Sequence, residues 1–129
     1  MTAARLAAAI GGLAGAETLL VNAQSPSEPG HKARVSGARR VDREMLDARE
    51  MLDRVASGIE ADVGTRPDAR VVVGDAAGTI RAAAEEAGLP VLTAIGSRGF
   101  GALARVMAGS VSTSVLRAAR GPVLVYGRP

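Results

Sequence analysis

Glycine and hydroxyl residues gather in one stretch of the chain, "GSRGFGALARVMAGSVS" at residues 96–112. Gly96, Gly99 and Gly109 can let a backbone approach a ligand closely, because glycine has no Cβ atom. A helix that begins at Ser110 would aim unpaired N–H groups and a partial positive charge at an anion. The stretch therefore predicts either a phosphate-binding site or, equally from the residues alone, a turn followed by an N-cap.

Three neighbours would strengthen a phosphate site. The guanidinium of Arg98 presents a fork of donors that suits a phosphate, and the N–H groups of Val111 and Ser112 would continue the first helical turn. The stretch matches neither the dinucleotide-binding G-x-G-x-x-G pattern nor the P-loop, and no Lys lies near it. The pattern by itself thus favours the binding of an anion but does not indicate which anion.

No other group of residues predicts catalysis or a metal site. The single histidine, His31, lies in a Pro/Gly-rich segment, and the chain has no cysteine. Glu85 and Glu86 are neighbours on a predicted helix and face different directions. Asp75 is best explained as an N-cap, and Ser97 has no base near it in the sequence. We predict no catalytic residue and no metal ligand.

Size and composition indicate one globular domain, residues 1–129, with 47% hydrophobic residues. No apolar run is long enough to span a membrane. The first twenty residues resemble a signal peptide, but Gly11, Gly12 and Glu17 interrupt the apolar segment, so we predict no targeting peptide. The absence of cysteine fits a cytoplasmic protein.

The positive charge does not predict nucleic-acid binding. The net charge is only +3, and the basic residues are scattered along the chain rather than clustered. Phe100 and Tyr126 are the only aromatic residues, so bases would find almost no surface on which to stack. We expect a solvated surface and no nucleic-acid partner.

Strands and helices alternate along the chain, and the strands are continuous apolar runs. This pattern predicts the α/β class, a parallel sheet with helices on both faces. Ligands of such sheets bind at the carboxyl ends of strands, which is where Gly96 would lie. The predicted helices are 3–14, 38–59, 74–88 (with its leading turn) and 110–119; the strands are 17–23, 69–73, 90–95 and 121–127; a flexible loop covers 24–38.

The spacing Gly96-x2-Gly99-x9-Gly109-Ser110 resembles the nucleotide-binding motif of the universal stress protein family. The sequence from Gly96 to Tyr126 is similar to the C-terminal half of that family. "VVVGDAAGTIRAAAEEAG" resembles its strand, Gly-Asp turn and helix, and "AARLAAAIGGLAGAETLLVNAQSP" resembles its first helix and second strand. The resemblance covers nearly the whole chain.

This resemblance implies a Rossmann-like, three-layer fold with five parallel strands, similar to adenine-nucleotide α-hydrolases. It also implies a cytoplasmic stress-response protein that binds ATP, with Mg²⁺, and forms a homodimer through the last strand, residues 122–126. By the same resemblance, Asn22 stands where the family often has His. The implied nucleotide-binding residues are Ala23, whose backbone borders the adenine; Ile95, the apolar position before the first glycine; Gly96, Arg98 and Gly99 at the ribose and phosphates; and Gly109, Ser110, Val111 and Ser112 at the phosphates.

One departure concerns the start of the chain. Family members begin with a central strand that ends in an Asp contacting the nucleotide, whereas this sequence starts inside the helix that should follow. We expect a start codon placed too late; the alternative is a sheet that closes differently. Three functions compete: an ATP-binding module, which we predict; a relative without nucleotide that acts through dimerisation or partner contact; and a slow ATP hydrolase.

Overall fold

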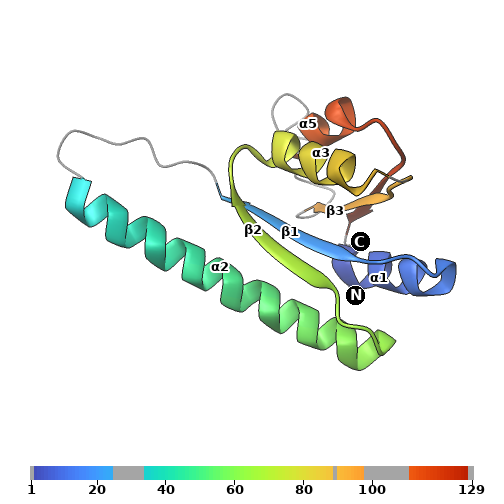
Figure 1. Cartoon of the computed structure of the whole chain (residues 1–129). Coiled ribbons are helices and arrows are strands. Elements are labelled where there is room, and N and C mark those ends of the chain that lie inside the picture. The colour runs from blue at the N-terminus through green and yellow to red at the C-terminus, as the bar shows by residue number, and fades with distance from the viewer. Residues whose placement is uncertain (1, 25–33, 89, 98–110, 128–129) are drawn as a thin grey trace.

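The computed structural model describes residues 2–24, 34–88, 90–97 and 111–127 (Figure 1). Helices and strands alternate throughout these residues, which confirms the predicted α/β class. No helix in these ranges is long and apolar enough to cross a membrane. The helices are α1 (Ala3–Ala14), α2 (Arg34–Val63), α3 (Ala76–Ala87) and α5 (Val111–Ala118); the strands are β1 (Leu19–Gln24), β2 (Asp68–Val73), β3 (Thr93–Ser97) and β4 (Val123–Gly127).

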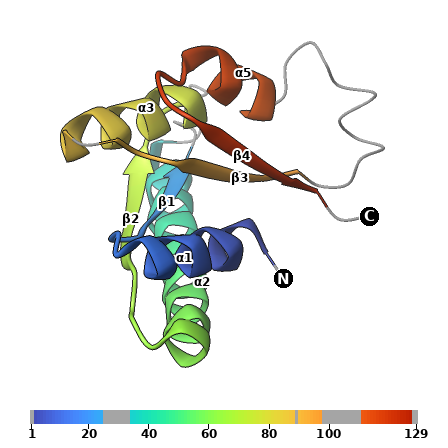
Figure 2. The same cartoon turned by 90° about the vertical axis from the view of Figure 1, so that its right-hand side faces the viewer.

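The described strands pair in two separate parallel sheets. β1 pairs with β2 from Leu19 opposite Asp68 onward, and β3 pairs with β4 from Thr93 opposite Val123 onward. In both views β1 lies between β2 and the β3–β4 pair (Figures 1 and 2). The parallel sheet is thus present as two halves rather than as the continuous five strands that the resemblance implies.

Helices cover both faces of the strands. Figure 2 shows α1 and α2 on one side and α3 and α5 on the other. α1 contacts β3, β4 and α2, while α2 contacts β1 and β2; on the opposite face α3 contacts β1 and α5. The two half-sheets are therefore held together through helices, in a three-layer arrangement.

The apolar core lies on the face covered by α1 and α2. Apolar residues recur at helical spacing along α2, and of these Ala48, Leu52 and Ile59 are buried in the structure. The small residues Ala4 and Ala8 of α1 pack in or against this core. The buried cluster consists of Ala8, Leu20, Leu52, Ala56 and Ile59, with Ala4, Val55, Val63 and Val71 packed against it.

Local sequence signals fix two of the helices. α1 ends at Gly15, which adopts the left-handed conformation with φ 67° that favours glycine. The carboxylate of Asp75 accepts a hydrogen bond from the N–H of Gly78 at 2.7 Å, and α3 ends at Gly88. The predicted N-cap is confirmed, and a glycine in the left-handed conformation follows the last residue of each of these helices.

The predicted bounds of the long helix, of the loop and of the third strand are wrong. The long helix runs over Arg34–Val63 rather than 38–59, because helix-favouring residues continue to Gly64, which ends it with φ 83°. The predicted loop 24–38 is correspondingly shorter: Gln24 belongs to β1, and residues 25–33 lie outside the described residues. β3 begins at Thr93 rather than at residue 90 and continues through Gly96 to Ser97.

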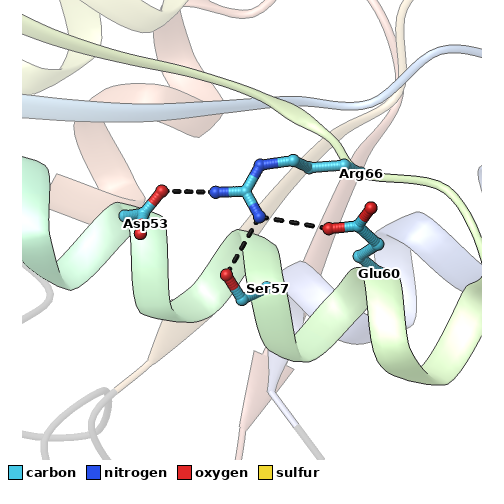
Figure 3. Close-up of polar contacts among 4 residues, drawn as sticks. All are labelled: Asp53, Ser57, Glu60 and Arg66. Carbon is cyan, nitrogen blue, oxygen red and sulfur yellow. Dashed lines mark hydrogen bonds and ion pairs between the residues drawn. The ribbon is translucent and has the colours of Figure 1, made fainter.

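Arg66, in the turn between α2 and β2, binds three side chains of α2 (Figure 3). Its guanidinium donates to Ser57 Oγ at 2.9 Å and to Glu60 Oε2 at 3.1 Å, and it also pairs with Asp53. These partners recur at helical spacing on one face of α2. The cluster is solvent-exposed, so we interpret it as a structural network of modest energy rather than a binding site.

Candidate functional site

The candidate site lies at the carboxyl ends of β1 and β3. Ala23 is the penultimate residue of β1, and Ile95 and Gly96 are the two residues before the last residue of β3. Val111 and Ser112 begin α5, one residue after the predicted start of this helix. The remaining candidates, Arg98, Gly99, Gly109 and Ser110, lie outside the described residues.

Gly96 is a strand residue and not part of a turn. It pairs with Tyr126 of β4, and it is not among the described glycines with positive φ. A Cβ atom built on Gly96 would lie 3.8 Å from the Cβ of Ala3, an ordinary van der Waals contact. Neither the backbone conformation nor the packing of the described residues requires glycine here, so the turn interpretation does not account for Gly96.

Two backbone hydrogen bonds between β1 and β2 establish which way the β1 backbone faces. The N–H of Asp68 donates to the carbonyl of Thr18 at 3.1 Å, and that of Gly74 donates to the carbonyl of Gln24 at 2.9 Å. In a parallel pair, successive residues turn their N–H and C=O to opposite sides. Alternate residues from Thr18 to Gln24 thus face β2, and Ala23 turns its backbone N–H and C=O away from β2, toward β3.

The same reasoning applies to β3. The N–H of Thr93 donates to the carbonyl of Pro122 at 3.1 Å, so Thr93 and Ile95 face β4. Gly96 therefore turns its N–H and C=O away from β4, toward β1. The fold thus directs the backbones of Ala23 and Gly96, more than seventy residues apart in the sequence, at the space between the two half-sheets.

Two amide side chains lie beside Ala23. The Gln24 side-chain NH₂ donates to Asn22 Oδ1, and both side chains are half-buried. Residues two apart on a strand share a face, here the face of Leu20 and α2. No role was predicted for Gln24, although the alternation of side chains along a strand would have indicated that it shares a face with Asn22.

Metal binding by protein side chains is not supported in the described residues. They hold no group of three or more His, Cys, Asp or Glu residues that could ligate an ion. Asp75, the acidic residue that follows β2, is engaged by the N–H of Gly78.

A hollow of about 450 Å³ lies away from the candidate site. It lies between α3 and α5 and reaches Val91 and Pro122, which precede β3 and β4. This is the amino end of the strands, opposite the edge at which ligands of parallel sheets bind. We therefore assign the candidate ligand site to the carboxyl ends and not to this hollow.

Comparisons with protein families and with solved structures point to the same family. A model of the universal stress protein family matches residues 1–127. The comparison with curated protein sequences gave no match. Similar solved structures include the universal stress protein UspA from Lactobacillus plantarum, with a TM-score of 0.79 and 18% identity over 95% of this chain and 86% of that one.

Two further structures have the same fold. A universal stress protein in complex with cAMP has a TM-score of 0.71 and 21% identity over 96% of this chain and 86% of that chain. A universal stress protein family member from Burkholderia pseudomallei has a TM-score of 0.66 and 23% identity over 98% and 85%. At these identities the similarity to solved structures establishes only the fold. Membership of the family rests on the match to the family model.

Proposed function

Because the chain belongs to the universal stress protein family, we propose that it is a nucleotide-binding module of a cytoplasmic stress response and that its ligand is ATP. The observation that supports the proposal is the direction of the Ala23 and Gly96 backbones, which turn away from β2 and β4, respectively, near the carboxyl ends of β1 and β3. One structure with the same fold holds cAMP, an adenine nucleotide.

The adenine ring suits the exposed backbone of Ala23. Its N6 amino group is a donor and its ring nitrogens are acceptors, and Ala23 presents one N–H and one C=O on the side away from β2. Ile95 is half-buried in β3, and we assign it to the apolar border of the site. This part of the site therefore complements adenine without any charged side chain.

The phosphates belong, in this proposal, at the N-terminus of α5. The N–H groups of Val111 and Ser112 open that helix, where the helix dipole favours an anion. The motif residues Arg98, Gly99, Gly109 and Ser110 would complete the cradle. Mg²⁺ would be held by phosphate oxygens, which are the ligands it prefers.

We propose binding rather than catalysis. Hydrolysis of ATP needs a group that activates or orients water, and the sequence provides no such constellation near the motif. ATP would therefore act as a bound signalling ligand, and the protein would hydrolyse it weakly at most.

Binding is tested directly on the purified chain. We expect a fluorescent ATP analogue to bind with micromolar affinity and to be displaced by ATP, and heating the protein to release adenine nucleotide. Inorganic phosphate serves as the control ligand, because it tests the anion site without the base. Failure of ATP to displace the analogue, together with no released nucleotide, would refute the proposal.

We further propose a homodimer through β4, the last strand. Leu124 and Tyr126 face β3, so Val123 and Val125 turn their backbone groups outward. Val125→Pro removes an outward N–H and no bond to β3. We expect this variant to be monomeric by light scattering and Val125→Ala to remain dimeric; a dimeric proline variant would assign the interface elsewhere.

A further inference from the structure

The turn between β2 and α3 lies at the carboxyl end of β2, beside the carboxyl end of β1. The carboxylate of Asp75 accepts a hydrogen bond from the N–H of Gly78 at 2.7 Å, and its carbonyl accepts one from the N–H of Thr79 at 3.0 Å. Asp75 thus closes the first turn of α3 with both its side chain and its backbone. Directly before it, the N–H of Gly74 donates to the carbonyl of Gln24 at 2.9 Å. The turn therefore links the start of α3 to the end of β1.

Two glycines of this turn are required by packing and not by backbone conformation. Neither Gly74 nor Gly78 is among the described glycines with positive φ. A Cβ atom on Gly74 would lie 2.9 Å from the hydroxyl oxygen of Thr79, and one on Gly78 would lie 2.8 Å from the carboxylate of Asp75. Both distances are too short for a carbon atom, so either side chain would force its neighbour to move.

The bond from Gly74 to Gln24 is the last described rung of the β1–β2 ladder, and it lies next to Ala23. Ala23 is paired with Val72, and the residues on either side of it, Asn22 and Gln24, face β2. Each peptide group that flanks Ala23 therefore has one half bonded to β2 and the other half turned away from β2. Because strands open from their ends, loss of the Gly74 bond would next release the peptide groups that set the direction of the Ala23 backbone.

Side-chain packing holds this end of β2 only weakly. Val72 and Val73 are 38% and 55% exposed. Of the six residues of β2, only Val71 packs against the buried cluster. The position of the carboxyl end of β2, and with it that of β1, therefore depends on the hydrogen bonds of the turn.

We propose that Asp75 is a positioning residue for the adenine end of the nucleotide site. Its carboxylate closes the turn, the turn places the Gly74 N–H on the Gln24 carbonyl, and that bond fixes the neighbouring Ala23 backbone. The inference rests on the proposed function, in which Ala23 binds adenine, and Asp75 itself touches no ligand. The phosphates are placed at the start of a different helix, α5. A defect at Asp75 is thus expected to weaken recognition of the base and to leave recognition of the phosphates intact.

Asp75→Ala tests the proposal on the full chain, by displacement of the fluorescent ATP analogue with ATP and with inorganic triphosphate. We expect this variant to bind ATP about three- to tenfold less tightly and to bind triphosphate as the original chain does. Without any nucleotide, we expect the Gly74 amide to exchange its hydrogen about tenfold faster. Asp75→Asn keeps an acceptor at the cap, and we expect it to behave as the original chain in both measurements.

Two further variants separate the turn from the general stability of α3. Glu86→Ala removes a 2.8 Å hydrogen bond from Arg70 that joins the same helix to the same strand away from the turn, and we expect unchanged ATP affinity. Gly74→Ala repeats the defect from the other side of the turn. The Thr79 hydroxyl is the single atom of the described residues within 4 Å of the new Cβ, so we expect Thr79→Ala to restore ATP affinity when added to Gly74→Ala.

The outcomes distinguish this inference from the proposed function. If the original chain does not bind ATP, the proposed function fails and this inference fails with it. If the original chain binds ATP and Asp75→Ala binds it equally well, only the inference fails. Equal losses of ATP and triphosphate affinity in Asp75→Ala would mean a general effect on stability and would overturn the positioning role. Loss of ATP affinity in Asp75→Asn would overturn it as well, because the charge and not the cap would then act on the nucleotide.

Discussion

Replacing Gly109 by Val is expected to weaken ATP binding at least about a hundredfold while leaving the fold intact. The physical reason is the Cβ atom. In the proposed site a phosphate lies against the backbone directly before α5, which begins at Val111, and a branched side chain at position 109 would occupy the space of the phosphate oxygens. The loss corresponds to about 2.7 kcal/mol or more of binding free energy.

Titration with the fluorescent ATP analogue measures this effect, and urea unfolding measures the fold. Gly96→Ala is the companion variant, because its Cβ would make only an ordinary contact with Ala3. We expect it to unfold at the same urea concentration as the original chain and to bind ATP several-fold less tightly. Unchanged affinity for ATP in both variants would show that neither glycine is needed for nucleotide binding.

The element pattern was predictable because its signals are local. The helix over 3–14 was predicted with both bounds, since alanines favour it and Gly15 ends it. The strand that contains Gly96 was predicted to stop one residue before it. Glycine weakens strand propensity, but pairing with Tyr126, thirty residues later, carries β3 past it. Such nonlocal pairing leaves no trace in the local pattern.

The candidate site was predictable only in part for the same reason. The phosphate half rests on a contiguous motif that local reasoning detects, from Gly96 to Ser112. The adenine half, as we propose it, depends on Ala23, a residue with no chemical signal of its own. Its importance follows from the direction of its backbone beside β3, which is set by the register of β1 on β2. The resemblance assigned this residue; composition and periodicity could not.

Replacing Ile59 by Ala is expected to destabilise the protein by about 2–5 kcal/mol. Ile59 is 1% exposed and packs in the cluster with Leu20 and Ala56, so truncation leaves a cavity between α2 and β1. The loss falls on the face where α2 packs against β1 and β2. A typical domain has about 5–15 kcal/mol in total, so the variant loses a large fraction of its stability.

Urea unfolding compares this variant with two others. Ile59→Val removes one methyl group and should cost about 0.5–1.5 kcal/mol. Leu13→Ala removes a side chain that is 93% exposed and should change stability by less than about 0.5 kcal/mol. Equal effects of Ile59→Ala and Leu13→Ala would mean that the α1–α2 face is not the core. The expected order, with Ile59→Ala far the largest, would establish that the half-sheet of β1 and β2 is held by this single cluster.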